Sequence, residues 1–146
     1  MKFAYDDGGR AAAGYQGQAG DCAVRALAIA CELPYQEAYD LVNRHALRER
    51  DSRRRRGRKS SARTGVFRAT FHRVLAELGW AWTPTMHIGS GCTVHVRADE
   101  LPRGRLILNL SKHYAAFVDG VLRDTYDDSR GGTRCVYGYW RKAGTP

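Results

Sequence analysis

Long apolar runs are missing from this 146-residue chain. A helix that spans a membrane needs about 20 consecutive apolar residues, and no stretch of the sequence approaches that length. The first ten residues, MKFAYDDGGR, also lack the apolar core of a secretory signal. We therefore expect a soluble protein that stays in a cytoplasm, and the length suits one domain over residues 1–146.

Cysteine is scarce, and its spacing excludes a common kind of metal site. The four cysteines, Cys22, Cys31, Cys92 and Cys135, form no CxxC pair, which argues against a structural zinc centre. In a cytoplasm, such widely spread cysteines are expected to be reduced thiols. We expect Cys31, Cys92 and Cys135 to be structural, which leaves Cys22 for chemistry.

Positive charge is concentrated in one segment. Residues 44–63 hold ten Lys or Arg and two acids, a net charge of +8, whereas the other 126 residues hold fourteen and thirteen, a net charge of +1. Such a run predicts a solvated, mobile loop, and it could also bind nucleic-acid phosphates, an acidic protein or an acidic substrate. The segment lacks Phe, Tyr and Trp, so base stacking is not expected. The candidate binding residues are Arg53, Arg54, Arg55, Arg56, Arg58 and Lys59.

Helices are predicted before and just after this basic segment, and strands follow them. Residues 1–20 are rich in Gly and Ala and predict a loop, and Asp21 suits the N-cap of the first helix. Apolar spacing predicts helices over 22–31, 35–46 and 67–78. Strand-like segments are 93–96, 105–110, 113–118, 121–126 and 135–140. The pattern predicts an α+β fold, with an N-terminal helical half packed on a C-terminal antiparallel β-sheet.

Asp119-Gly120 predicts a two-residue hairpin turn. Such a turn sets the register of the two strands that it joins. Because side chains alternate between the faces of a strand, His113 and Asp124 then lie on one face as diagonal neighbours, roughly 7 Å apart at the backbone. A carboxylate beside an imidazole fixes its tautomer and stabilises its charged form. The hairpin therefore predicts a His113–Asp124 pair.

The stretch YQGQAGDCAVRALAIA, residues 15–30, places Cys22 at the start of the first predicted helix. Free N–H groups and the positive end of the helix dipole favour a thiolate there, and a nearby imidazolium would favour it further. Acyl chemistry also needs donors for an oxyanion, and the candidates are the backbone N–H of Cys22 and the side-chain amide of Gln16. Together with His113 and Asp124, these residues would form a complete set for nucleophilic acyl chemistry that needs no metal or organic cofactor.

The segment QGQAGDC, residues 16–22, resembles the QGxxGxC signature of papain-like cysteine peptidases. The chain order also matches that family, with Gln and Cys on a helical half and His and then Asp on a later sheet. The resemblance implies a papain-like fold in which Cys22 is the nucleophile, His113 the base, Asp124 the orienting residue and Gln16 the oxyanion residue. The sequence departs from the family pattern at Ala23, where an aromatic residue is frequent, and at Asp124, where Asn is frequent.

In size the chain is similar to the compact papain-like domains that process bacteriocin leaders. The runs GDCAVRALAIA and HYAAFVDGVLRDTYD also resemble small proteins of phages and their bacterial hosts. This resemblance implies a phage or prophage origin, with the protein in the host cytoplasm or the virion. The implied activity is that of a thiol protease acting on peptide or isopeptide bonds, and deamidation or acyl transfer would use the same groups.

Other interpretations of the same residues stay open. His95 is the rival base, Asp127 is the rival orienting residue, and Asn109 is a weaker candidate for the orienting role. A DC pair at a helix start, with a histidine on a strand, is also typical of NlpC-type murein peptidases. A non-enzymatic nucleic-acid-binding protein built around residues 44–63 is the alternative from a different class.

Overall fold

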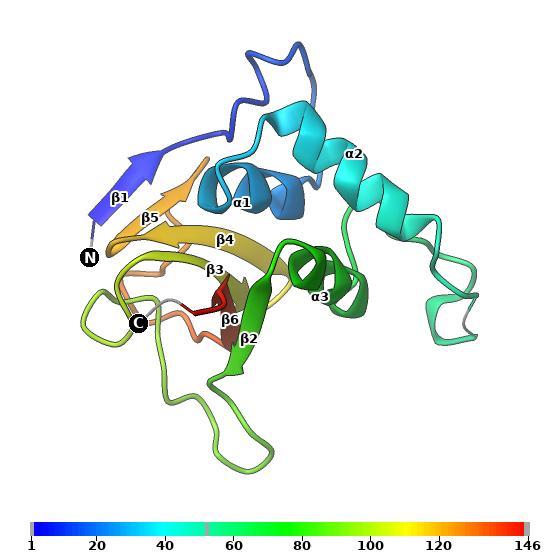
Figure 1. Cartoon of the computed structure of the whole chain (residues 1–146). Coiled ribbons are helices and arrows are strands. Elements are labelled where there is room, and N and C mark those ends of the chain that lie inside the picture. The colour runs from blue at the N-terminus through cyan, green and yellow to red at the C-terminus, as the bar shows by residue number, and fades with distance from the viewer. Residues whose placement is uncertain (1, 52, 145–146) are drawn as a thin grey trace.

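The structure is a computed structural model that describes residues 2–51 and 53–144. Within these ranges, three α-helices and a six-stranded mixed sheet confirm the predicted α+β class (Figure 1). The helices are α1 (Cys22–Ala30), α2 (Tyr35–Ala46) and α3 (Arg68–Glu77), with a 3₁₀ turn at Arg53–Arg55. The strands are β1 (Lys2–Tyr5), β2 (Trp80–Pro84), β3 (Arg105–Leu110), β4 (His113–Val118), β5 (Val121–Asp124) and β6 (Gly138–Lys142).

The strands lie in the order β1-β5-β4-β3-β6-β2. Neighbouring strands are antiparallel except β1 and β5, which are parallel. The expectation of a purely antiparallel sheet and of a loop throughout residues 1–20 is therefore wrong. Strand β1 joins the sheet edge through its backbone, and most of its side chains stay exposed. Its sequence therefore lacks the apolar alternation that would predict a strand.

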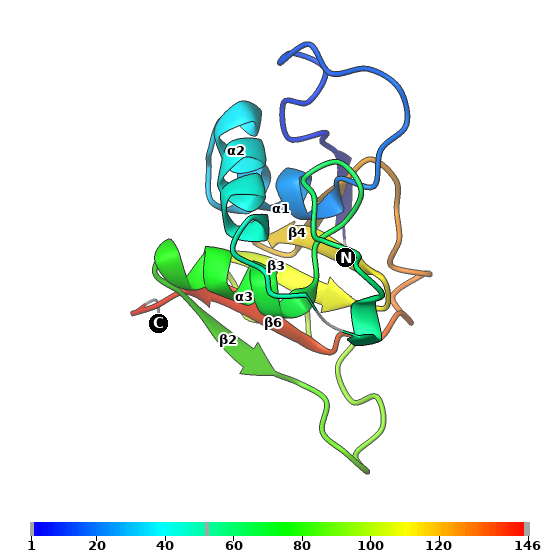
Figure 2. The same ribbon diagram turned by 90° about the vertical axis from the view of Figure 1, so that its right-hand side faces the viewer.

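The three helices cover one face of the sheet, and loops cover the other (Figures 1 and 2). Helix α1 packs on β4, α2 packs on α1, and α3 packs on α2 and β2. Phe71 of α3, Tyr114 of β4 and Trp140 of β6 form an aromatic cluster on the helical face. On the opposite face, Phe117 packs with apolar residues of the loops that precede β3 and β6. No helix among the described residues is long and apolar enough to cross a bilayer.

The Asp119-Gly120 turn sets the register of β4 and β5, as predicted. Both residues have a positive φ, 49° and 79°, as a two-residue turn of type I′ requires. Val118 faces Val121, and the pairing continues along both strands. The register on which the His113–Asp124 prediction depends is thus confirmed.

The segment around residues 85–97 differs from the prediction. Instead of a strand over 93–96, it makes a single bridge between His95 and Cys135, and Cys92 and Cys135 form a disulfide with their Cα atoms 5.8 Å apart. The expectation that all four cysteines are reduced is therefore wrong, because only Cys22 and Cys31 are free. The bonded cysteines are 43 residues apart, and only the fold brings them together.

Gly138 of β6 is expected to tolerate no side chain. A Cβ at this position would overlap the indole ring of Trp82 and approach the carbonyl oxygen of Thr83 to 2.9 Å. The ring cannot simply turn away, because it packs on Trp140 with the ring centroids 4.5 Å apart. We expect Gly138→Ala to lower the free energy of unfolding by about 1–3 kcal/mol, as overpacked sites do.

Urea unfolding followed by tryptophan fluorescence measures this loss. The control is Ala81→Ser, an exposed position on the adjacent strand, which should change stability by less than about 0.5 kcal/mol. Equal stability of the two variants would contradict the packing that we describe at Gly138.

Candidate active site

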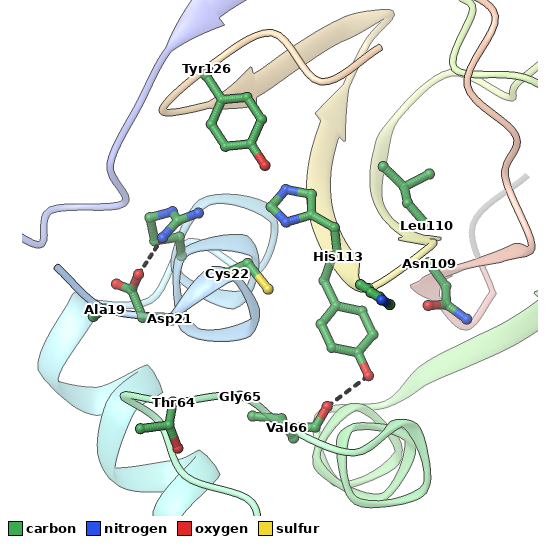
Figure 3. Close-up of a pocket in the computed structure, with 14 residues that line it drawn as sticks. Ala19, Asp21, Cys22, Thr64, Gly65, Val66, Asn109, Leu110, His113 and Tyr126 are labelled. Atoms are coloured by element: carbon green, nitrogen blue, oxygen red, sulfur yellow. Dashed lines mark hydrogen bonds and ion pairs between the residues drawn. The ribbon is translucent and has the colours of Figure 1, made fainter. Parts of the chain in front are cut away.

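Three elements bring the predicted nucleophile, base and acid together. Cys22 is the first residue of α1, His113 is the first of β4, and Asp124 is the last of β5. Cys22 and His113 line one pocket of about 440 Å³, and the sulfur of Cys22 points toward the imidazole ring (Figure 3). The N-terminus of α1 and the start of β4 therefore meet at one end of the sheet.

The predicted contact between His113 and Asp124 is confirmed. Nε2 of His113 lies 2.6 Å from Oδ2 of Asp124, and the two side chains are only 9% and 3% exposed. Because Nε2 faces the carboxylate, Nδ1 is the ring nitrogen that is left for Cys22. The geometry fixes one tautomer of the ring and one orientation, while the catalytic roles of these residues stay a prediction.

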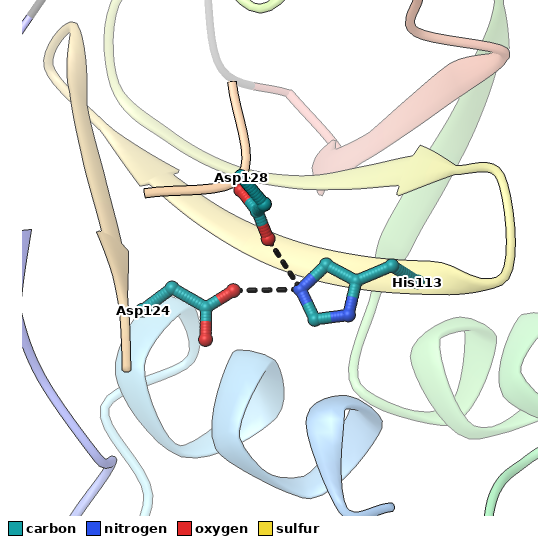
Figure 4. A group of neighbouring side chains, drawn as sticks. All are labelled: His113, Asp124 and Asp128. Atoms are coloured by element: carbon teal, nitrogen blue, oxygen red, sulfur yellow. Dashed lines mark hydrogen bonds and ion pairs between the residues drawn. The ribbon is translucent and has the colours of Figure 1, made fainter. Parts of the chain in front are cut away.

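A second carboxylate contacts the same ring nitrogen (Figure 4). Oδ2 of Asp128 lies 2.6 Å from Nε2 of His113, and Asp128 is buried. Asp127, the predicted rival, instead accepts hydrogen bonds from the backbone and hydroxyl of Ser129. Strand β5 ends at Asp124. The alternation of side chains along a strand therefore does not decide which way Asp127 and Asp128 point. The run of two acids directly after the hairpin is the only sequence signal for Asp128.

The surroundings shift the pKa of all three groups. Burial favours a neutral His113, but the hydrogen bond with Asp124, the close contact with Asp128 and the interaction with Cys22 outweigh it and raise its pKa to about 12. Burial also opposes ionisation of Asp124, yet the hydrogen bond from His113 lowers the pKa of this carboxyl. For Asp128, burial and the adjacent Asp124 carboxyl together raise the pKa. The ring is therefore held as an imidazolium between two different carboxyl groups.

A buried arginine connects the helix to this cluster. Arg25 lies on α1 and contacts both Asp21 and Asp124, with its Nη2 atom 3.3 Å from Oδ1 of Asp124. Asp21 also pairs with Arg10 and accepts a hydrogen bond from Tyr35. Asp21 occupies the predicted N-cap position, but its carboxylate makes no capping hydrogen bond because these partners take it. A lone arginine in an apolar helix signals such a network, since buried cations need paired anions.

His113, Asp124 and Asp128 each offer one atom that could ligate a metal ion. Zinc ligands lie about 2.0–2.2 Å from the ion, which separates tetrahedral donors by about 3.3 Å. Here each carboxylate oxygen lies 2.6 Å from Nε2 of the histidine, and the Arg25 cation contacts the same cluster. These distances fit direct contacts between the side chains better than donors that share an ion.

The structure does not bring Gln16 to the position expected of it. Gln16 is an exposed loop residue that is absent from the pocket lining, and its backbone carbonyl accepts a hydrogen bond from Arg10. The same guanidinium bonds the carbonyl of Gly17, so Arg10 organises this glycine-rich loop outside the pocket. The expected placement of the Gln16 amide beside Cys22 is therefore wrong in this structure.

The other candidates for the site lie in different surroundings. His95 pairs with Glu100 at 3.0 Å and does not line the pocket. Asn109 does line the pocket, from β3. Cys31, at the end of α1, is free, and burial raises the pKa of its thiol to about 12.

The basic segment is partly built around a buried acid. Glu49 accepts hydrogen bonds from the backbone of Ser60 and the hydroxyl of Thr70, and Lys59 bonds the Glu49 carbonyl and pairs with Asp51. Arg55 lies over the ring of Phe67 at 4.3 Å. The remaining predicted contact residues, Arg53, Arg56 and Arg58, are exposed, and the side chain of Arg54 lies outside the described part of the structure.

Comparison of the chain with models of known families, with curated proteins and with solved structures finds no match in any of the three. The geometry of the pocket therefore carries the functional interpretation.

We expect the ring of His113 to remain charged well above neutral pH. Its pKa of about 12 in the folded protein exceeds the ordinary value of 6.5, so the native state binds the extra proton more tightly. The resulting stabilisation is fully present below about pH 6.5 and is lost as the pH rises toward about 12. Nitrogen-15 NMR should show two protonated ring nitrogens at about pH 9, with the His113→Gln spectrum providing the assignment.

Unfolding measurements give an independent check. The stability difference between the wild type and His113→Gln should shrink as the pH is raised from about 6.5 to about 10. A ring that loses its proton near neutral pH, or a difference that grows with pH, would contradict the described surroundings.

Proposed function

We propose that this protein is a papain-like thiol protease that hydrolyses peptide or isopeptide bonds. One observation carries the proposal: the Cys22 thiol, at a helix N-terminus, faces an imidazole whose far nitrogen lies 2.6 Å from a buried carboxylate. Nucleophile, base and orienting acid in that relation are the requirements of covalent acyl chemistry. The order of these groups along the chain, and the QGQAGDC segment, agree with the resemblance noted in the sequence.

In the proposed reaction, the Cys22 thiolate attacks the substrate carbonyl carbon and the carbonyl electrons move to oxygen. The imidazolium of His113 then gives its Nδ1 proton to the leaving amine as the carbon–nitrogen bond breaks, which leaves a thioester on Cys22. The neutral ring next takes a proton from water, whose oxygen attacks the thioester. Release of the acid restores the thiol sulfur, and the proton returns to it or stays on His113.

The N-terminus of α1 supplies the oxyanion site in this proposal. The first N–H groups of a helix have no partners within the helix, and the carboxylate of Asp21 does not cap them. The backbone N–H of Cys22 is therefore available to a developing oxyanion beside its own sulfur. This donor takes the place that the sequence resemblance assigns to Gln16.

The pocket has two walls between which an extended chain can lie. Thr64, Gly65 and Val66 form one side, and Tyr126 lies on the opposite side (Figure 3). The hydroxyl of Tyr114 donates to the Val66 carbonyl at 3.0 Å and so holds the first wall against β4. Tyr126 is 54% exposed, with its ring 5.8 Å from that of His113. An open groove with the thiol at its floor favours a peptide over a small enclosed substrate.

We expect iodoacetamide at mildly acidic pH to label Cys22 far faster than any other cysteine. Cys31 should be nearly inert because burial raises the pKa of its thiol to about 12, and Cys92 and Cys135 are bonded to each other. His113→Ala should slow labelling of Cys22, because it removes the cation that stabilises a thiolate. Peptide mapping by mass spectrometry measures each rate, and equal labelling of Cys22 and Cys31 would overturn the assignment of the nucleophile.

Hydrolysis of a peptide library, read by mass spectrometry, tests the function itself. Cys22→Ala should abolish cleavage, and His113→Ala should reduce kcat/KM by about 10²–10⁴-fold. The matched control is Cys31→Ala, which removes the other free thiol and should retain cleavage. Digestion of peptidoglycan without cleavage of peptides would instead identify a murein peptidase, and no cysteine-dependent hydrolysis of either substrate would reject the proposal.

A further inference from the structure

We propose that Asp128 is a positioning residue for His113 and that it holds a proton shared with Asp124, so that the two buried carboxyl groups carry one negative charge between them. The proton assignment rests on the contacts of the two carboxyls. Its consequence for catalysis rests on the function proposed above.

One ring nitrogen of His113 contacts two carboxyl groups. Oxygens of Asp124 and Asp128 both lie 2.6 Å from Nε2 of His113, yet this nitrogen carries a single proton that can point to only one of them. The contact with Asp124 has the geometry of a hydrogen bond. Neither carboxyl oxygen of Asp128 has a hydrogen-bond partner of that geometry among the described residues, and both are shielded from solvent. Asp124 is therefore the acceptor of the Nε2 proton.

Burial makes an ionised Asp128 costly. The residue is 4% exposed, and a buried carboxylate without hydrogen-bond donors loses its hydration with no compensation. A proton on Asp128 turns one of its oxygens into a donor that can bond the neighbouring Asp124 carboxylate. The two carboxyl groups are neighbours, because each has an oxygen 2.6 Å from the same Nε2 atom and they offer oxygens within 4.8 Å of each other. Protonation of Asp128 thus gives a hydrogen bond to a buried group whose ion pair with His113 uses the nitrogen that already bonds Asp124.

Asp124, in contrast, is surrounded by donors. It accepts hydrogen bonds from His113, from the backbone of Thr125 at 2.7 Å, and from Arg25 at 3.3 Å. Arg134 bonds the Asp128 backbone carbonyl and not its carboxyl group. This asymmetry places the negative charge on Asp124 and the proton on Asp128.

Other titratable groups surround the two carboxyl groups. The side chains that contact carboxyl groups of the cluster are Arg10, Arg25 and His113, and the acids that they contact are Asp21, Asp124 and Asp128. The Tyr35 hydroxyl faces Asp21, and the rings of Tyr114 and Tyr126 border the pocket.

A neutral Asp128 has a direct consequence for the proton on His113. Two ionised carboxylates on one nitrogen would hold the imidazolium so tightly that it would be a poor acid toward a leaving amine. With Asp128 protonated, Asp124 alone faces the ring as an anion, while the Asp128 hydroxyl fixes the orientation of Asp124. Asp128 therefore sets both the position of the ring and the readiness with which it gives up its proton.

The substitution Asp128→Asn distinguishes a protonated Asp128 from an ionised one. The asparagine amide keeps a donor for Asp124 and never carries a charge. In Asp128→Asn, iodoacetamide should alkylate Cys22 at a rate within about threefold of the wild type, because the donor to Asp124 is retained. Asp128→Ala should slow alkylation about tenfold to a hundredfold, the scale of losing one hydrogen bond to a charged group, and should change its pH profile. Asp127→Asn is the matched control and should behave as wild type.

Carbon-13 NMR of the aspartate carboxyl groups provides a readout that needs no catalysis. The Asp128 signal, assigned by its loss in Asp128→Asn, should be that of a protonated carboxyl at pH 7, and the Asp124 signal that of a carboxylate. An ionised Asp128 at pH 7, or equal slowing in the Asn and Ala variants, would overturn the proposal. A protonated Asp128 in a protein that hydrolyses no peptide would support the shared proton and reject only the proposed function.

Discussion

The contact between His113 and Asp124 is the interaction on which the rest of the site depends. It spans two neighbouring strands, so it exists only if the turn at Asp119-Gly120 sets their register. A slip by one residue would move one partner to the other face of the sheet. The imidazole is thereby fixed with one nitrogen bonded to a carboxylate and the other facing Cys22 at the opening of α1 (Figures 3 and 4).

Buried charge is the second constraint, and it joins the helix to the sheet. Arg25 contacts Asp21 at the start of its own helix and Asp124 at the end of β5. Removing one member of such a network leaves an uncompensated buried charge, which is strongly destabilising. The network therefore fixes how the N-terminus of α1 sits relative to the hairpin, and with it the approach of the thiol to the ring.

The surroundings of the site show how one protein can keep several charged groups out of water. In the site, Asp21 and Asp124 are bonded to cations, and we propose that Asp128 is neutralised by a proton. The basic segment is arranged differently. The buried Glu49 carboxylate bonds Ser60 and Thr70 and so orders the part of the segment that packs on the protein, while several arginines remain exposed. The site and the basic segment are joined through residues 64–66, which directly follow the segment and form one wall of the pocket.

Local patterns in the sequence determined the helices, the central strands and the hairpin, because apolar periodicity and turn chemistry act between near neighbours. They placed Cys22 at a helix start and predicted the His113–Asp124 contact, since a two-residue turn leaves only one register. Only the tertiary structure decided the Cys92–Cys135 bond, the parallel strand β1, the exposed position of Gln16 and the contact of Asp128 with His113. Each of these depends on contacts between distant segments or on the path of the chain beyond a strand end, where the alternation of side chains no longer holds.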